Sequence, residues 1–204
     1  MTEGFARGHP EPLDLPDAQI VLHRDVYAPG EQERLTQALR REIAWEQHRI
    51  TLYGRTMPVP RLSAWHGDPG AVYRYSGVRL SPRPWTPLLT AIREVAQELA
   101  GAPFNSVLLN LYRQGGDSVG WHSDDEPELG PEPVIASVSL GAPRRFELEH
   151  KRSRRREALE LPPGSILVMA GATQHRWRHR LPKTRAPVGP RVNLTFRRIL
   201  PAAP

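Results

Sequence analysis

The sequence predicts a mainly β fold, a β-sandwich or jelly roll covered by two helices that precede it. In residues 104–200, short runs rich in Val, Leu and Phe alternate with Gly and Pro turns, which is typical of many short strands. In residues 29–101, by contrast, apolar residues recur every three or four positions in two stretches, as they do on one face of a helix. A chain of 204 residues and 23.0 kDa has room for one sizeable core, and we expect a single domain over residues 20–200.

The N-terminal quarter is expected to contribute a tail, a strand and a helix. Residues 1–19 are rich in Pro, Gly and charged residues, and this composition predicts a flexible tail. Residues 20–23 (IVLH) indicate a short strand. A helix is predicted over residues 29–45, because it begins at a Pro-Gly pair and then carries an apolar residue at every fourth position.

A second helix is predicted from its boundary residues. Thr86 can act as the N-cap, Pro87 suits the first helical turn, and Gly101 can end the helix. Between the two helices, residues 50–85 contain five prolines and four glycines among aromatic residues, which predicts a structured flap with short strands.

The C-terminal half is predicted to form the jelly-roll core, at about residues 104–200. Turn residues separate its apolar runs, for example the Gly-Gly pair at 115–116. The predicted strands cover residues 104–112, 134–140, 145–149, 158–161, 165–169 and 191–199.

Composition excludes several classes of site. The chain has no cysteine, so it cannot form a disulfide scaffold, a thiolate zinc site or an iron–sulfur cluster, and any metal must be held by nitrogen and oxygen. The longest apolar runs are far shorter than the roughly 20 residues that cross a bilayer. The first residues lack the features of a signal peptide, so we expect a cytoplasmic protein.

Charge is distributed unevenly along the chain. Residues 144–198 contain 15 Lys and Arg against 4 Asp and Glu, whereas residues 1–143 contain 13 against 18. A basic C-terminal half suggests a polyanionic partner such as nucleic acid. The alternative is a skewed genome composition, because 26 of the 28 basic residues are Arg.

A metal site without cysteine requires His and carboxylate ligands, which the pattern His-x-Asp supplies compactly. The pattern occurs three times, at residues 23–25, 66–68 and 122–124, against roughly 0.3 occurrences expected by chance. His122 and Asp124 follow an apolar strand and the Gly-Gly turn at 115–116, and His175 stands 51 residues beyond them, just after another apolar strand. Two His and one Asp are the facial triad of non-haem Fe(II) oxygenases. The alternative is a pair of surface histidines with a turn aspartate.

The last strand carries two arginines on one face. Arg191, Asn193, Thr195 and Arg197 alternate with apolar residues, so they share one side of the strand. Either this side faces water, or it faces the interior, where the arginines require an anion. A dicarboxylate would suit both the metal site and the arginines, because one of its ends can chelate the metal while the other pairs with Arg.

Taken together, these motifs resemble the AlkB family of Fe(II)- and 2-oxoglutarate-dependent dioxygenases, which dealkylate nucleic acids. The similar segments are residues 110–117 (NLYRQGGD), residues 120–126 (GWHSDDE), His175 and residues 191–197 (RVNLTFR). Residues 53–77 also resemble the flap of the AlkB homologues that repair duplex DNA.

The resemblance implies a double-stranded β-helix and a set of site residues. It implies three iron ligands, His122, Asp124 and His175. The implied 2-oxoglutarate contacts are Asn110, Tyr112, Arg191, Asn193, Thr195 and Arg197. The implied substrate contacts are Tyr53, Tyr73, Tyr75, Ser76, Asp125 and Glu126. Among them, Tyr53 lies where the duplex-repair relatives have an apolar finger that fills the gap left by the extruded base.

The activity that the resemblance implies is oxidative demethylation of bases such as 1-methyladenine and 3-methylcytosine in DNA. Fe(II), 2-oxoglutarate and O₂ are required, and succinate, CO₂ and formaldehyde are released. The alternatives are the same chemistry on RNA or another methylated substrate, and an inactive nucleic-acid-binding module. Residues 144–156 and 176–185 are expected to contact phosphates. We expect a monomer without membrane contacts, associated with the nucleoid or located in a nucleus.

Overall fold

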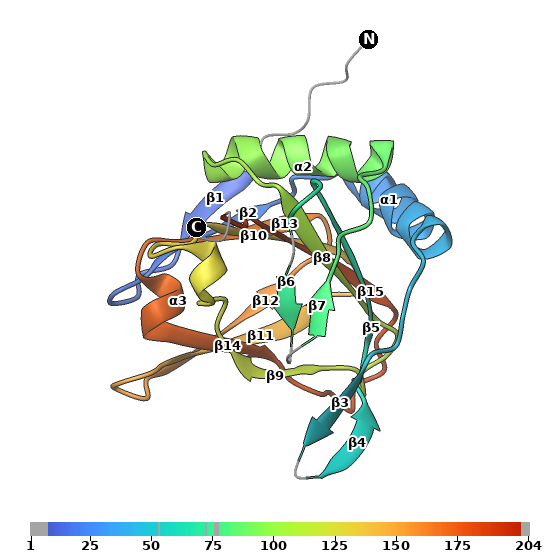
Figure 1. The fold of residues 1–204 in the computed structure, drawn as a ribbon. Helices are drawn as coiled ribbons and strands as arrows, with labels where there is room; N and C mark the ends of the chain where they lie inside the picture. The colour runs from blue at the N-terminus through green and yellow to red at the C-terminus, as the bar shows by residue number, and fades with distance from the viewer. Residues whose placement is uncertain (1–7, 53, 72, 76–77, 201–204) are drawn as a thin grey trace.

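Two antiparallel sheets face each other and form a jelly-roll core in this computed structural model, which describes residues 8–52, 54–71, 73–75 and 78–200 (Figure 1). The strands are β1 (His9–Pro12), β2 (Gln19–Arg24), β3 (Arg49–Leu52), β4 (Arg55–Pro58), β5 (Leu62–Gly67), β6 (Tyr73–Tyr75), β7 (Val78–Leu80), β8 (Ser106–Tyr112), β9 (Val119–His122), β10 (Ile135–Gly141), β11 (Arg144–His150), β12 (Arg156–Leu161), β13 (Ser165–Ala170), β14 (Trp177–Leu181) and β15 (Arg191–Arg197). The helices are α1 (Pro29–Glu42), α2 (Pro87–Ala100), the short α3 (Thr173–Arg176) and the 3₁₀ turn η1 (Pro127–Leu129).

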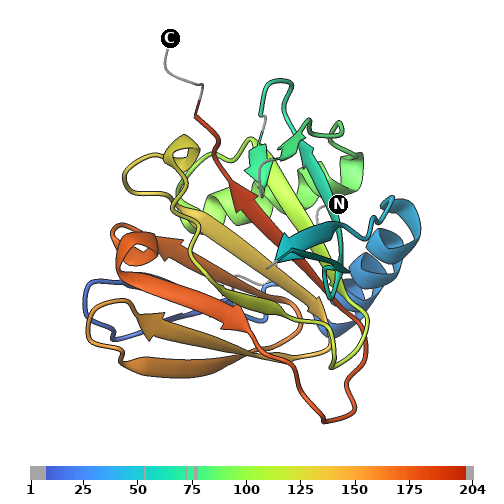
Figure 2. The ribbon, with the colours of Figure 1, turned by 60° about the horizontal axis from the view of Figure 1, so that its bottom comes forward.

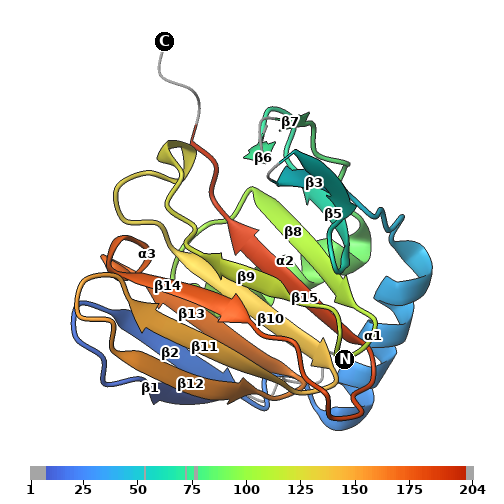
Figure 3. The ribbon, with the colours of Figure 1, turned by 90° about the horizontal axis from the view of Figure 1, so that it is seen from below.

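The larger sheet has seven strands in the order β1-β2-β13-β10-β15-β8-β5, and the smaller has four in the order β12-β11-β14-β9. Figures 2 and 3 show the smaller sheet lying across one face of the larger one. Consecutive strands often lie in different sheets, as β14 and β15 do. Residues far apart in the sequence are thereby brought together between the two sheets.

Two apolar cores lie on opposite sides of the larger sheet. One joins α1 and α2 to the outer side of this sheet, and the other fills the space between the sheets. On β15, Val192, Leu194 and Phe196 belong to the helix-side core. Because side chains alternate along a strand, the polar residues of β15 project between the two sheets. All seven residues of β15 are buried, so its polar side does not face water.

The two long helices largely match the prediction. The Thr86 hydroxyl caps α2 by accepting a hydrogen bond from the Leu89 amide at 3.2 Å, and Gly101 ends the helix with a φ of 61°. The first helix ends at Glu42, three residues earlier than predicted, because Ile43 adopts an extended conformation. No helix in the described part of the chain is long and apolar enough to cross a membrane.

Each predicted strand of the core is present, with boundaries shifted by a few residues, but two core strands were missed. These are β9 and β14, which are short and carry Gly, His or Arg in place of continuous apolar residues. The predicted N-terminal tail is too long, because His9–Pro12 forms an edge strand paired with β2. Within the expected flap, Leu62–Gly67 is instead the edge strand β5 of the larger sheet. The flap's two hairpins, β3–β4 and β6–β7, lie near this edge (Figure 3).

Replacing Thr86 with Ala is expected to lower the free energy of unfolding by about 1 kcal/mol, because the α2 amides lose their side-chain acceptor. Urea denaturation followed by circular dichroism measures the change. Thr86→Ser keeps the hydroxyl and is expected to retain most of the stability. Equal losses in both variants would contradict the capping role.

Candidate active site

A cavity of about 360 Å³ lies between the two sheets and is bordered by polar side chains. Its walls come from β8, β9, β14 and β15, and from the segment that follows β4. The polar residues that line it are Arg61, Asn110, Tyr112, Ser118, His122, Asp124, Ser137, His179, Arg191, Asn193, Thr195 and Arg197. All six residues predicted to contact 2-oxoglutarate are among them. So are two of the three predicted metal ligands.

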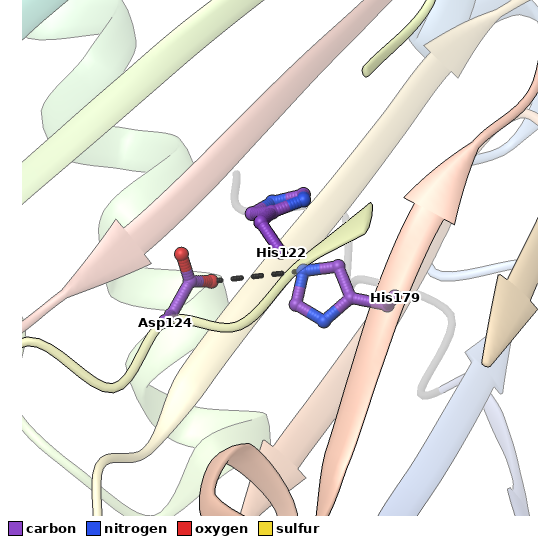
Figure 4. A group of neighbouring side chains, drawn as sticks. All are labelled: His122, Asp124 and His179. Carbon is purple, nitrogen blue, oxygen red and sulfur yellow. Dashed lines mark ion pairs between the residues drawn. The ribbon is translucent and has the colours of Figure 1, made fainter. Parts of the chain in front are cut away.

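Three side chains converge on one side of this cavity (Figure 4). His122 ends β9, Asp124 lies two residues beyond it, and His179 is the central residue of β14. One potential ligand atom from each lies within 4.8 Å of the others. The Asp124 Oδ2 and His179 Nε2 atoms are 4.0 Å apart, a separation that leaves space for an ion to bind both. Two imidazoles and a carboxylate in this arrangement form a facial metal site.

Neighbouring groups orient two of these ligands. The His122 Nδ1–H donates to the Gly120 carbonyl at 2.9 Å, which leaves Nε2 as the metal-binding nitrogen. The Asp124 amide donates to the buried side chain of Gln174 at 3.0 Å. Arg197 donates to Asp124 Oδ1 at 2.8 Å and leaves Oδ2 facing His179. The site is therefore arranged before any ion binds.

Both buried ligands have protonation states suited to a cation. Burial alone would raise the pKa of the Asp124 carboxyl, but the positive charges of Arg197, His179 and His122, together with the hydrogen bond from Arg197, outweigh this effect, and the pKa falls to about 2. Burial lowers the pKa of His179 to about 3, and the nearby His122 adds to the shift. At neutral pH the carboxylate is ionised and the His179 imidazole is neutral, as metal ligands must be.

His175 does not join this group, so the prediction that it is the third ligand is wrong. The residue lies in α3, where its side chain is exposed and its Nε2 contacts the Pro131 carbonyl. The physical reason is the single helical turn of α3, which follows β13 and turns His175 away from the space between the sheets. The chain re-enters the smaller sheet only at Trp177, and His179 is its second inward-facing residue.

The sequence contains a signal that identifies His179. In residues 177–181 (WRHRL), Trp, His and Leu alternate with two arginines. The Trp, His and Leu side chains are buried, and the two arginines are partly exposed. This period of two predicts a strand whose inner face carries His179. The arginines of this segment instead led to the prediction that residues 176–185 contact phosphates.

The polar side of β15 provides the positive charge of the cavity. Arg191 is only 2% exposed and donates to Ser139 Oγ at 2.9 Å, while its Nε has no hydrogen-bond partner among the described residues. Burial lowers the pKa of Arg191 to about 10, which leaves it charged at neutral pH. A buried guanidinium with an unused donor fits an anionic ligand in the cavity.

Other predicted pocket residues already take part in a hydrogen-bond network. Asn193 donates to Ser137 Oγ at 2.8 Å and accepts from the Thr195 hydroxyl at 3.0 Å. Asn110 accepts from Arg61 Nε at 2.7 Å. Arg61 is a buried cavity residue that was not predicted, although residues 60–61 lie in the segment similar to the AlkB flap.

The predicted base contacts are only partly described. Tyr53 and Ser76 lie outside the described residues, and Tyr73 and Tyr75 belong to β6 without a description of their side chains. The Asp125 carboxylate accepts from Lys151 Nζ at 2.8 Å on the surface. Neither Asp125 nor Glu126 lines the described cavity.

The other two His-x-Asp pairs form no metal site within the described chain. His66 lies against the Pro84 carbonyl at 2.7 Å, and Asp68 accepts from Trp85 Nε1 at 2.7 Å. His23 is a partly buried residue of β2, and Asp25 follows that strand with a φ of 54°. The two hydrogen bonds give His66 and Asp68 a structural role.

The basic residues of the C-terminal half divide into two groups. On the outer face of the smaller sheet, Arg156, Arg178 and Arg180 surround the Trp121 ring, with guanidinium carbons 4.5–5.9 Å from its centroid. Several of these arginines also pair with the carboxylates of β11, such as Glu149. Arg144, by contrast, is 3% exposed, which contradicts its predicted contact with phosphates.

The fold and the site define a jelly-roll metal enzyme with a cationic pocket beside its metal centre. Comparisons with known proteins agree. Residues 19–197 match the family model described as the 2OG-Fe(II) oxygenase superfamily. The human DNA oxidative demethylase ALKBH2 is 42% identical over 186 residues, which cover 86% of this chain and 71% of that protein. The human alpha-ketoglutarate-dependent dioxygenase alkB homolog 3 is 41% identical, over 90% of this chain and 67% of that protein.

Two more distant similarities also extend over most of the chain. The Arabidopsis thaliana DNA oxidative demethylase ALKBH2 is 34% identical, over 92% of this chain and 69% of that protein. The solved structure titled "The structure of OsALKBH1" superposes with a TM-score of 0.64 at 15% identity, over 93% of this chain and all of that one. The latter likeness concerns the fold alone.

The chain belongs to the AlkB family of the 2OG-Fe(II) oxygenase superfamily. It is therefore a dioxygenase that uses Fe(II), 2-oxoglutarate and O₂. Its residues fit these groups, because neutral imidazole and ionised carboxylate suit Fe(II), and the unused Arg191 donor suits a carboxylate.

His179→Ala is expected to weaken divalent metal binding by roughly 100-fold or more, since losing a ligand should cost more than losing a group that merely orients one. Titration of the apoprotein with Mn(II), followed by electron paramagnetic resonance, measures the change. His175→Ala is the matched control and is expected to bind Mn(II) like the wild type. A larger loss in His175→Ala than in His179→Ala would contradict the assignment.

Proposed function

We propose that this enzyme removes alkyl groups from N-alkylated bases in DNA, such as 1-methyladenine and 3-methylcytosine. The proposal is supported chiefly by identities of 40–42% to mammalian proteins named DNA oxidative demethylase ALKBH2, combined with the metal site between the sheets. When bound, Fe(II) and 2-oxoglutarate supply the activation of O₂ and the oxidation of the alkyl carbon. Each turnover consumes one O₂ and converts 2-oxoglutarate to succinate and CO₂, and the hydroxymethylated base then loses formaldehyde.

In this proposal, the chain's own groups divide between the two ends of the cavity. His122, Asp124 and His179 hold the metal, and Arg197 keeps the carboxylate ionised and directs one of its oxygens toward the metal. Arg191 binds the distal carboxylate of 2-oxoglutarate through its unused donor.

The remaining pocket residues fix the orientation of the co-substrate. Asn110, Tyr112, Asn193 and Thr195 line the same cavity, and the hydrogen bonds of Asn193 and Thr195 hold the wall of β15 rigid. A fixed wall keeps the reacting end of 2-oxoglutarate at the metal.

The substrate base enters from the flap side in this proposal. Ile50, Val59 and Pro60 border the cavity there, and their apolar surface suits the face of a base. Tyr73 and Tyr75 on β6, with Ser76, are proposed to hold the extruded base by stacking and hydrogen bonds, and Tyr53 is proposed to fill the gap that the base leaves in the duplex. Asp125 and Glu126 are proposed to accept hydrogen bonds from the exocyclic amine of adenine or cytosine.

Exposed basic residues are proposed to bind the phosphate backbone. They lie in the β11–β12 turn and in the segments around β14: Arg152, Arg154, Arg155, Arg156, Arg176, Lys183 and Arg185. Contacts of this kind are independent of base sequence and weaken as salt concentration rises.

The purified protein with Fe(II), ascorbate and 2-oxoglutarate is expected to demethylate oligonucleotides that carry a single 1-methyladenine or 3-methylcytosine. Mass spectrometry measures the loss of the methyl group, and single- and double-stranded DNA and RNA of the same sequence are compared. Tyr75→Ala is expected to abolish demethylation but to leave most of the uncoupled conversion of 2-oxoglutarate to succinate.

Two results would contradict this function. Demethylation of RNA alone would assign the same chemistry to a different nucleic acid. Binding of methylated DNA without any formation of succinate would indicate an inactive binding module.

A further inference from the structure

A second buried arginine lies behind the cationic end of the cavity. Arg144 begins β11 and shares the inward-facing side of this strand with Phe146, which lines the cavity. Arg144 itself does not line the cavity. Burying a guanidinium is costly unless its charge and its donors are used, so this position calls for a specific role.

The two buried arginines flank one aromatic ring. Arg191 lies 5.4 Å and Arg144 lies 5.8 Å from the centroid of the Tyr112 ring, measured from each guanidinium carbon. Both distances are within the range of cation–π attraction. Tyr112 is also the cross-strand partner of Arg191 in the register of β8 and β15. Both guanidinium groups are therefore close enough to interact with the Tyr112 ring, and of the two only Arg191 lines the cavity.

Arg144 also joins the two loops that close this end of the barrel. Its Nη2 donates to the Asp117 carbonyl at 2.9 Å and to the Pro182 carbonyl at 2.7 Å. The first carbonyl belongs to the loop between β8 and β9, and the second to the loop between β14 and β15. The loops also meet directly, because the Thr184 amide donates to the Gly115 carbonyl at 2.9 Å.

Gly115 shows how closely these loops approach each other. A Cβ atom built on Gly115 would lie 2.5 Å from the Thr184 carbonyl oxygen, a distance that real Cβ atoms do not show. The end of the cavity is therefore closed by a fixed contact, and Arg144 is bonded to both sides of it.

We propose that Arg144 is a positioning residue that sets the length of the co-substrate pocket by joining the two loops and holding Tyr112 against Arg191. A keto dicarboxylate fits only if its distal carboxylate reaches Arg191 while its other end reaches the metal. Movement of Tyr112 and the loops would lengthen the pocket and weaken the preference for 2-oxoglutarate over a longer homologue. This inference rests on the proposed contact between Arg191 and the distal carboxylate.

The test measures the dissociation constants of 2-oxoglutarate and of 2-oxoadipate, its homologue with one more methylene. Both are titrated calorimetrically into protein loaded with Mn(II) under anaerobic conditions. Arg144→Met removes the charge and the donors but keeps most of the side-chain length. We expect it to weaken 2-oxoglutarate binding about tenfold and to reduce the preference over 2-oxoadipate by a similar factor. Arg144→Lys keeps the charge without the planar donor group and is expected to give intermediate values.

Two further variants make the outcome decisive. Arg93→Met is the matched control, because Arg93 is a largely buried arginine that stacks on Trp85 at 4.5 Å in the helix layer, and both affinities should be unchanged. Arg191→Met should abolish binding of both acids. If Arg191→Met binds 2-oxoglutarate normally, the contact assigned to Arg191 is wrong, and the proposed function of the pocket fails first.

If Arg191→Met loses binding but Arg144→Met keeps the wild-type affinity and preference, the role of Arg144 is overturned. A parallel loss of affinity for both acids with an unchanged ratio also overturns it, because a general loss of structure would act in that way. If Arg144→Met does not fold, the Arg144→Lys values decide the question by the same criteria.

Discussion

The buried ion pair between Asp124 and Arg197 links the two sheets and underlies the chemistry of the site. Asp124 follows β9 of the smaller sheet, Arg197 ends β15 of the larger one, and each side chain is only 4% exposed. Removing either partner would leave an uncompensated charge in the interior. The pair also aims the free oxygen of Asp124 at His179, so one interaction fixes both the packing of the sheets and the metal ligand.

The interior beyond this pair carries excess positive charge at its far end. Arg191 and Arg144 are almost completely buried there, and most of their described contacts are with neutral groups, namely a hydroxyl, an aromatic ring and backbone carbonyls. The Asp117 carboxylate, which pairs with Arg113, also attracts Arg144, and a dicarboxylate co-substrate would add a further anion beside Arg191. The buried guanidinium groups thus both destabilise the fold and favour a dicarboxylate co-substrate.

The sequence allowed most of the fold to be predicted, because local signals were strong where packing follows periodicity. The cap at Thr86, the stop at Gly101 and the alternation along β15 depend on neighbouring residues alone. The choice between His175 and His179 cannot be made from neighbouring residues, because it depends on the turn of α3 that separates β13 from β14. Family resemblance indicated His122 and Asp124, which the structure brings together, but its third residue, His175, lies four positions before the histidine that joins them. The burial of Arg144 could not be predicted either, since nothing in a basic segment distinguishes an interior arginine from one at the surface.

The arrangement of the metal site can be tested most directly by crystallising the protein with Mn(II) and an inert analogue of 2-oxoglutarate, with anomalous diffraction data used to locate the metal. We predict a single strong anomalous peak among His122, Asp124 and His179, with the distal carboxylate of the analogue against Arg191. A metal bound to His175, or an analogue whose distal carboxylate lies away from Arg191, would contradict the assignment of the site.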